Sequence, residues 1–236
     1  MSSALNFLSG GAAQGLVAAL GPAFEAAHGI RLQGQFGAVG AMKQKLLDGA
    51  PSDVLILTQA LIDGLTVSGH VRADSARPLG TVMTGLAVQS AQPDPEVHDA
   101  DSLRQALRQA HGIYFPDPQL ATAGIHFMKV LQALGVAEQL ADRLRPYPNG
   151  AKAMQAMAAS EDPKVMGCTQ VTEILITPGI KRVADLPAGL ELATVYTAAV
   201  TTAAAQAELA AQWVAVLSGA SAATARHAAG FQPLSA

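Results

Sequence analysis

Short loops of glycine, alanine and hydroxyl residues stand directly before helix-forming segments at several places in this chain. Ser9-Gly10-Gly11 precedes an expected helix over residues 16–27, and Gly37-Ala38-Val39-Gly40 precedes another over residues 41–47. Unpaired amides and the dipole at a helix N-terminus favour a bound anion. The alternative is that Ser9 only caps its helix and the glycines only make the turn. Because the arrangement recurs, the sequence favours an anion site.

Two further loops of this kind are Ala121-Thr122-Ala123-Gly124 and Tyr147-Pro148-Asn149-Gly150. Thr122 and Asn149 offer polar side chains beside free amides, although both are also common capping and turn residues. Thr58 adds a hydroxyl at the end of an apolar strand over residues 54–57, where open α/β sheets bind their ligands. The sequence predicts that these loops line a cleft for a small anion.

The elements that must position these loops alternate along the chain. Apolar runs of strand length are separated by segments of helical spacing, which predicts βαβ units and an α/β fold with mainly parallel sheets. Helical spacing is clear at Phe127, Val130 and Leu131, where Gly135 is the expected stop, and at Leu103 and Leu107. The expected strands cover residues 5–8, 31–36, 54–57, 78–88, 112–115, 144–146, 165–168 and 190–196.

Two of the expected strands are unusually long, over residues 79–88 and 190–200, and we expect them to be crossings between two lobes. The first lobe then comprises residues 1–82 plus 197–236, and the second comprises residues 83–196. Two hinge strands of this kind permit closure around a ligand held between the lobes.

The composition excludes several classes of partner and chemistry. Only 14% of the residues are charged and the net charge is −3, so the chain has no electrostatic footprint for nucleic acid. The single cysteine, Cys168, lies in an expected buried strand, where an inert thiol is favoured over a nucleophile. The histidines show no metal-ligand spacing. We therefore expect no metal and no cofactor.

The order of the elements resembles the molybdate-binding-protein-like family of periplasmic solute-binding proteins, which have a two-lobed fold of type 2. The residues that carry the resemblance cover nearly the whole chain: 5–11, 32–40, Gly49-Ala50-Pro51-Ser52-Asp53, Pro116-Asp117-Pro118, 121–124, 167–173 and Gly230-Phe231. Ser9-Gly10-Gly11 and Gln170-Val171-Thr172-Glu173, with Pro178-Gly179 after it, are closer to a branch that includes aconitate isomerase.

The resemblance and the loop chemistry together give a set of expected ligand-binding residues: Ser9, Gly10, Gly11, Ala38, Val39, Thr58, Thr122, Ala123, Asn149 and Gln170. Gln170 stands where molybdate receptors commonly have a tyrosine that donates to the oxyanion, and Ala38-Val39 replaces a serine-rich loop. A glutamine amide also accepts a hydrogen bond, which a protonated carboxyl or a hydroxyl group can donate and a fully deprotonated oxyanion cannot. These departures disfavour molybdate and favour an organic acid.

The resemblance implies a solute-binding protein that closes two lobes over a small anion, an organic polycarboxylate or a tetrahedral oxyanion such as molybdate. It also implies delivery to the permease of an ABC-type transporter in the membrane. The alternative is an isomerase of the aconitate type, which moves a proton and needs a base with a tuned pKa. Glu173, His126 and Lys43 are the candidates for that base, and none of them stands out.

A third class with this fold, the ligand-sensing domain of a transcription regulator, normally carries a helix-turn-helix segment, and none precedes Leu5. No basic and apolar leader precedes the first expected strand either. Two interpretations remain open: a leader has been removed and the protein works in the periplasm, or it works in the cytoplasm. We expect a monomer.

Overall fold

The computed structural model describes residues 3–234 and divides into two compact units. The first unit contains the residues up to Val82 together with those from Thr194 onward, and the second is Met83–Ala193. Residues 1–2 and 235–236, which the sequence assigns to the first lobe, lie outside the described residues. That the two units are lobes joined by a hinge stays a prediction.

The sheet of the first unit has the strand order β2-β1-β3-β9. Its strands are β1 (Ser3–Gly10), β2 (Ile30–Gly37), β3 (Val54–Thr58) and β9 (Ala193–Val200). β1 pairs in parallel with both β2 and β3, and β9 pairs antiparallel with β3. The helical elements are η1 (Gly11–Ala13), α1 (Gln14–His28), α2 (Val39–Leu47), α3 (Gln59–Val67), α8 (Ala207–Ser218), η3 (Ala220–Ala222) and α9 (Ala223–Ala228).

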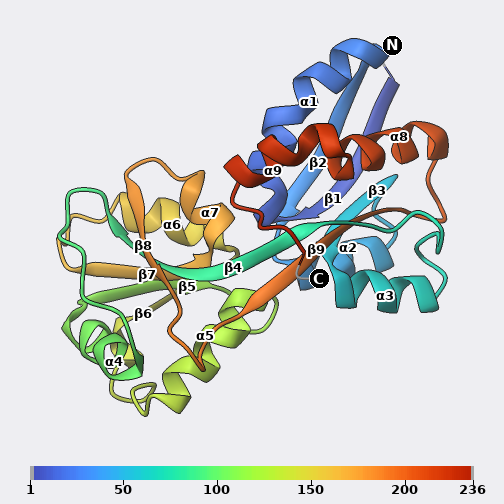
Figure 1. Ribbon diagram of the computed structural model, residues 1–236. Coiled ribbons are helices and arrows are strands. Elements are labelled where there is room, and N and C mark those ends of the chain that lie inside the picture. Colours follow the sequence, from blue (N-terminus) through green and yellow to red (C-terminus); the bar gives the residue numbers. More distant parts are fainter. Residues whose placement is uncertain (1–2, 235–236) are drawn as a thin grey trace. The chain divides into compact units, whose positions relative to one another are not determined.

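The helices of the first unit cover both faces of its sheet. Right-handed crossovers place α1 and α2 on opposite faces, because the chain moves outward from β1 to β2 and then back to β3. Figure 1 shows α8 and α9 on the same side as α1, and α2 and α3 on the other side. All five residues of β3 are buried, as expected for a strand covered on both faces. Trp213 of α8 packs on Phe24 of α1, with ring centroids 4.8 Å apart.

The sheet of the second unit has β4 (Arg77–Gln89), β7 (Val165–Gln170), β5 (Gly112–Pro116) and β6 (Leu144–Tyr147) in that order, and β8 (Ile180–Asp185) pairs with β4. The β5–β6 and β5–β7 pairs are parallel, whereas β4 is antiparallel to both β7 and β8. The helical elements are α4 (Ala100–Gln109), α5 (Thr122–Ala133), η2 (Ala141–Arg143), α6 (Gly150–Ala158) and α7 (Val171–Leu175).

Alternation along β4 separates two apolar cores in the second unit. Leu86 and Val88 belong to the core under α4 and α5, whereas Ala87 belongs to the core under α6 and α7. Successive side chains of a strand point to opposite faces, so one strand contributes to both cores. Cys168 lies in the first of these cores with no exposed surface, which confirms its expected place in a buried strand.

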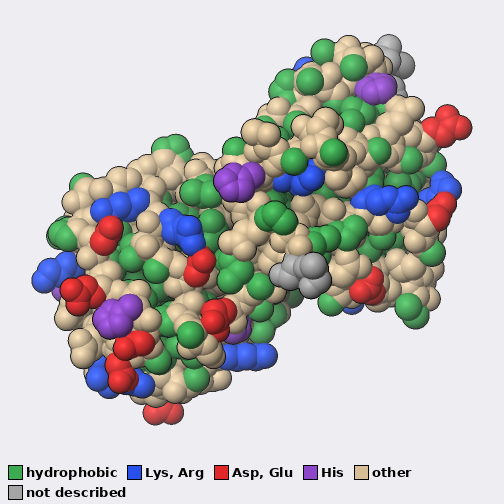
Figure 2. All heavy atoms as spheres, in the orientation of Figure 1, with side chains coloured by type: hydrophobic (Ala, Val, Ile, Leu, Met, Phe, Trp, Pro, Cys, Tyr) green, Lys and Arg blue, Asp and Glu red, His purple; other side chains and the backbone are tan. Residues whose placement is uncertain are grey.

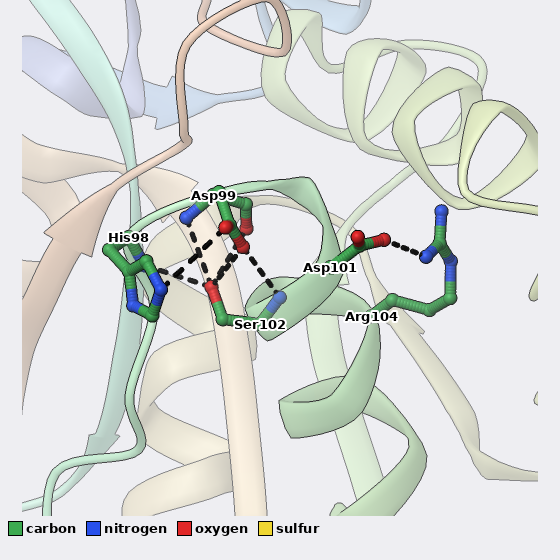
Figure 3. Close-up of polar contacts among 5 residues, drawn as sticks. All are labelled: His98, Asp99, Asp101, Ser102 and Arg104. Atoms are coloured by element: carbon green, nitrogen blue, oxygen red, sulfur yellow. Dashed lines mark hydrogen bonds and ion pairs between the residues drawn. The ribbon is translucent and has the colours of Figure 1, made fainter.

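Local signals set the ends of the helices. Asp99 accepts a hydrogen bond from the Ser102 amide at 2.8 Å, and the Ser102 hydroxyl accepts one from the Asp99 amide at 3.0 Å, which makes a capping box at the start of α4 (Figure 3). The hydrogen bond from the Ser102 amide lowers the pKa of Asp99. Gly135 has a φ of 67° just after α5, which confirms it as the stop.

The structure corrects the sequence analysis in two respects. β8 was not expected, because the half-buried Lys181 and the exposed Arg182 interrupt its apolar pattern. The sheets are mixed rather than mainly parallel, since β9, β4 and β8 make antiparallel pairs. The parallel direction is imposed by βαβ crossovers, and no crossover helix links β3 directly to β9 or β4 to β7.

Candidate functional site

In the first unit, the expected ligand loops lie together at one edge of the sheet. Gly10 pairs in register with Gly37, and Ser9 with Ile56, so the parallel strands β1, β2 and β3 end side by side. Thr58 pairs with Tyr196, so the beginning of β9 lies at the same edge. The structure therefore groups the six residues expected here: Ser9, Gly10, Gly11, Ala38, Val39 and Thr58.

The helical elements that start at this edge have no side-chain caps. Gly10, Ala38 and Thr58 are the N-cap residues of η1, α2 and α3, and none of them accepts a capping hydrogen bond through its side chain. The first amides of a helix have no partner within the helix. They are therefore available to an anion, with the helix dipoles adding to the attraction.

Gly10 allows the loops of this edge to pack closely. A Cβ atom at Gly10 would lie 2.8 Å from Cγ1 of Val39 and 3.0 Å from Cε1 of Tyr196. Only a glycine fits between these side chains without displacing them. Ser9 is fully buried, and its hydroxyl donates to the Gly10 carbonyl at 2.9 Å. In this arrangement the Ser9 hydroxyl is left as an acceptor, and donation to a ligand requires it to rotate.

In the second unit, the remaining expected residues also gather at one edge. β5 is parallel to β6 and β7, so the loops with Thr122 and Asn149 lie beside the end of β7 at Gln170. Gln170 pairs in register with Thr84, which brings the beginning of this unit's part of β4 to the same edge. Within each unit, the strand that leads to the other unit thus lies at the edge with the candidate loops.

The start of α5 is open in the same way as the helix starts of the first unit. Its N-cap residue is Ala121, which has no side-chain cap, and Thr122 and Ala123 form the first turn. Asp117 accepts from the amides of Gln119 and Leu120 at 2.7 and 2.9 Å and so orders the loop before the helix. A Cβ atom at Gly124 would lie 2.2 Å from the Pro116 carbonyl oxygen, so a glycine is required where α5 begins against β5.

The start of α6, in contrast, is occupied by the protein's own side chains. The Asn149 side chain accepts from the Lys152 amide at 2.9 Å, and Oε1 of Glu173 accepts from the Ala151 amide at 3.3 Å. Oε2 of Glu173 accepts from the Thr169 hydroxyl at 2.6 Å. A Cβ atom at Gly150 would lie 1.9 Å from both oxygens of that pair. The side-chain oxygen of Asn149 is therefore engaged as a cap, and only its amide nitrogen is left for a ligand.

The three candidate bases differ in their surroundings. Burial raises the pKa of Glu173, against the hydrogen bond from Thr169, and the carboxyl serves as a cap of α6. Nε2 of His126 lies 2.8 Å from the Leu190 carbonyl oxygen, and Lys43 is half-buried on α2. Burial also raises the pKa of the Cys168 thiol, which fits an inert side chain. Among residues 3–234, no group of three or more histidine, cysteine or acidic side chains is placed to hold a metal ion.

Sequence reasoning missed the two residues that the crossing strands bring to these edges. Thr84 and Tyr196 are buried and stand opposite Gln170 and Thr58. The only local signal at Thr84 is a hydroxyl within the apolar stretch of β4 over residues 82–88. Which strand pairs with which depends on contacts distant in sequence, so no loop motif points to either residue.

Figure 2 shows acidic and basic side chains interspersed over the visible face of each unit, without a large patch of one sign. A nucleic-acid site needs clustered positive charge. In the described part of the chain, every helix falls short of the length and apolarity needed to cross a membrane.

The chain belongs to the family of bacterial extracellular solute-binding proteins, whose model matches residues 5–232. A relative by sequence is the aconitate isomerase of a Pseudomonas species, which is 26% identical over 238 residues, covering 98% of this chain and 88% of that protein. The expected resemblance to molybdate-binding-protein-like receptors is confirmed at the level of the family and fold.

Solved structures with the same fold include two oxyanion receptors. The periplasmic molybdate-binding protein of Azotobacter vinelandii superimposes with a TM-score of 0.80 at 20% identity, covering 97% of this chain and 98% of that chain. The sulfate-binding protein SubI of Mycobacterium tuberculosis superimposes with a TM-score of 0.77 at 17% identity, covering 98% of this chain and 87% of that chain.

Proposed function

We propose that this protein is a periplasmic receptor that closes its two units over a small organic polycarboxylate and delivers it to the permease of an ABC-type transporter. The observation that carries the proposal is the set of helix starts without side-chain caps at Ala38, Thr58 and Ala121. In each unit these starts lie at the edge to which the connecting strands run. A ligand bound at both edges would draw the two units together about those strands.

The chemistry of the loops supports a polycarboxylate over a tetrahedral oxyanion. Ala38 has no hydroxyl to offer, and Gln170 has both a donor and an acceptor at the end of β7. A partly protonated or hydroxylated organic acid matches both halves of that amide, whereas a fully deprotonated oxyanion matches only the donor. The sulfate- and molybdate-binding structures support the fold but come with low sequence identity.

A second candidate function is isomerisation of a small polycarboxylate, which the 26% identity to an aconitate isomerase favours. The reaction needs a base near an acidic carbon. Glu173 is buried against α6, and His126 is bonded to the Leu190 carbonyl, so each would have to give up a structural contact. Lys43, half-buried on α2, is the remaining candidate.

The test is a thermal-shift panel with citrate, cis-aconitate, trans-aconitate, molybdate, tungstate, sulfate and phosphate. A ligand at 100 times its Kd stabilises a protein by about 2.7 kcal/mol. For a chain of this length each kcal/mol raises the Tm by roughly 2–4 °C. We expect a shift of several degrees with polycarboxylates and none with tetrahedral oxyanions; a shift with oxyanions alone would overturn the proposed ligand class.

Any aconitate isomer that binds is then incubated with the protein and followed by proton NMR. Conversion of one isomer into the other would establish the second candidate, and Lys43→Met would then test the base. An unchanged spectrum over many hours, in a sample that still binds the ligand, would exclude the isomerase and retain the receptor function.

A further inference from the structure

Two threonine hydroxyls in the second unit are buried without a partner. Thr84 on β4 is 0% exposed and Thr172 on α7 is 1% exposed. Within the part of the chain that the structure describes, neither Oγ1 atom has a hydrogen-bond partner. A hydroxyl removed from water without a replacement hydrogen bond destabilises a protein. Two such groups in one unit point to hydrogen bonds with a ligand or with bound water.

The two hydroxyls belong to one region of the second unit. Thr84 stands directly opposite Gln170 in the antiparallel β4–β7 pair, and Thr172 follows Gln170 by two residues. Side chains directly opposite each other in such a pair point to the same face of the sheet. The next residue of β4, Gly85, faces the other way, since a Cβ atom there would lie 2.9 Å from Cγ2 of Val171.

The backbone of Thr84 is already satisfied, so only its hydroxyl lacks a bond. The Thr84 amide donates to the Leu192 carbonyl at 2.9 Å, and its carbonyl accepts from the Leu186 amide at 3.2 Å. These two hydrogen bonds hold the backbone of β4 in place at Thr84. The side chain is thus held in place by the fold rather than by its own hydrogen bond.

Other buried threonines of the same unit do not share this property. The Thr169 hydroxyl donates to Glu173 at 2.6 Å, and the Thr177 hydroxyl donates to the Glu173 carbonyl at 2.8 Å. Among the buried threonines of this unit, the missing partner is therefore particular to Thr84 and Thr172.

We propose that the hydroxyls of Thr84 and Thr172 donate hydrogen bonds to a carboxylate of the ligand, beside the amide of Gln170. This inference rests on the proposed function and adds to it a subsite in the second unit. Hydroxyl donors satisfy carboxylate oxygens without placing a buried positive charge beside them. The subsite would hold one carboxylate, and the open start of α5 would hold another part of the same anion.

The test uses Thr84→Val and Thr172→Val, which replace each hydroxyl by a methyl group of similar size. We expect each change to raise the Kd for the polycarboxylate by at least about tenfold in calorimetric titrations, because a hydrogen bond to a charged group is lost. The Tm without ligand should stay the same or rise, because the unsatisfied hydroxyl is gone. Thr177→Val is the matched control, in which the Tm should fall and the Kd should stay within about twofold.

Three results would overturn the inference. The first is wild-type affinity in both valine variants. The second is a fall in their ligand-free Tm as large as that of Thr177→Val, which would assign the hydroxyls to bound water. The third is a loss of affinity for sulfate or molybdate but not for polycarboxylates. If the wild-type protein binds none of the anions, the proposed function is wrong, and the subsite inferred from it is wrong as well.

Discussion

Glu173 is the side chain whose role changes most between the sequence and the structure. In sequence it is a candidate base three residues after Gln170. In the structure the residue is 5% exposed, and its carboxyl lies at the start of α6, where it accepts from the Ala151 amide and the Thr169 hydroxyl. Gly150 leaves the room that this contact needs. The residue is thus placed to hold α6 against α7 and the end of β7.

Burial raises the pKa of Glu173, which makes the stability of the protein depend on pH. The folded state holds the proton of the Glu173 carboxyl more tightly than the unfolded chain does. The contribution of this proton to the stability of the fold is therefore complete below the unfolded pKa of about 4.3. It is lost as the pH rises from that value through the higher pKa of the folded state. Glu173→Gln keeps an acceptor and has no proton to lose. We therefore expect the Tm of this variant to increase relative to the Tm of the wild type as the pH rises.

Thermal unfolding of both proteins between pH 4 and pH 8 checks this expectation. Glu138→Gln removes the charge of an exposed glutamate of the same unit and controls for the change in net charge. A constant difference in Tm between Glu173→Gln and the wild type across this range would show that the carboxyl titrates as in the unfolded chain.

At the scale of elements, the helix starts fall into two groups. α4 and α6 have polar caps of their own, whereas α2, α3 and α5 start after residues whose side chains make no capping bond. A cap satisfies first-turn amides within the protein and so removes them from a ligand. The open starts of α2, α3 and α5 also lie at the edges with the candidate loops and so define the candidate site, and α6 contributes mainly stability.

Asn149→Ala should destabilise the protein by about 1 kcal/mol, since the amide of Lys152 loses its acceptor. Asn149→Ser, which keeps a capping oxygen, should recover most of this loss. Urea denaturation midpoints measure both differences. The expectation would be wrong if the alanine and serine variants were equally destabilised, because the effect would then come from a contact other than the cap.

At the scale of the whole molecule, the chain passes between its two units at Val82 and again before Thr194. β4 continues through the first passage as one strand of 13 residues. In the proposed function these two passages are the hinge. A receptor that closes over its ligand becomes more compact, and the change is visible in solution without any assumption about the starting arrangement.

We therefore expect a saturating polycarboxylate to reduce the radius of gyration measured by small-angle X-ray scattering. An anion from the panel that gives no thermal shift, added at the same ionic strength, serves as the control. An unchanged radius of gyration with a ligand that calorimetry shows to be bound would rule out closure while leaving binding intact.

The sequence by itself determined most of the elements and the chemistry of the loops. Alternation and helical spacing gave strands and helices near their observed positions, because a strand or helix with an apolar face carries that pattern locally. The glycine and hydroxyl loops before α2 and α5 could also be recognised, because their residue types stand next to one another in the sequence. The family resemblance was also contained in these local motifs.

Only the tertiary structure decided which groups meet. The pairing of Thr84 with Gln170 and of Thr58 with Tyr196 joins residues far apart in the chain, and so does the contact of Glu173 with the start of α6. Antiparallel pairing of β9 with β3, and of β4 with β7, brings the connecting strands to the loop edges. The packing of the entire sheet selects which strands pair. The pairing in turn decides which buried polar groups find a hydrogen-bond partner. For that reason the unpartnered hydroxyls of Thr84 and Thr172 became visible only in the folded chain.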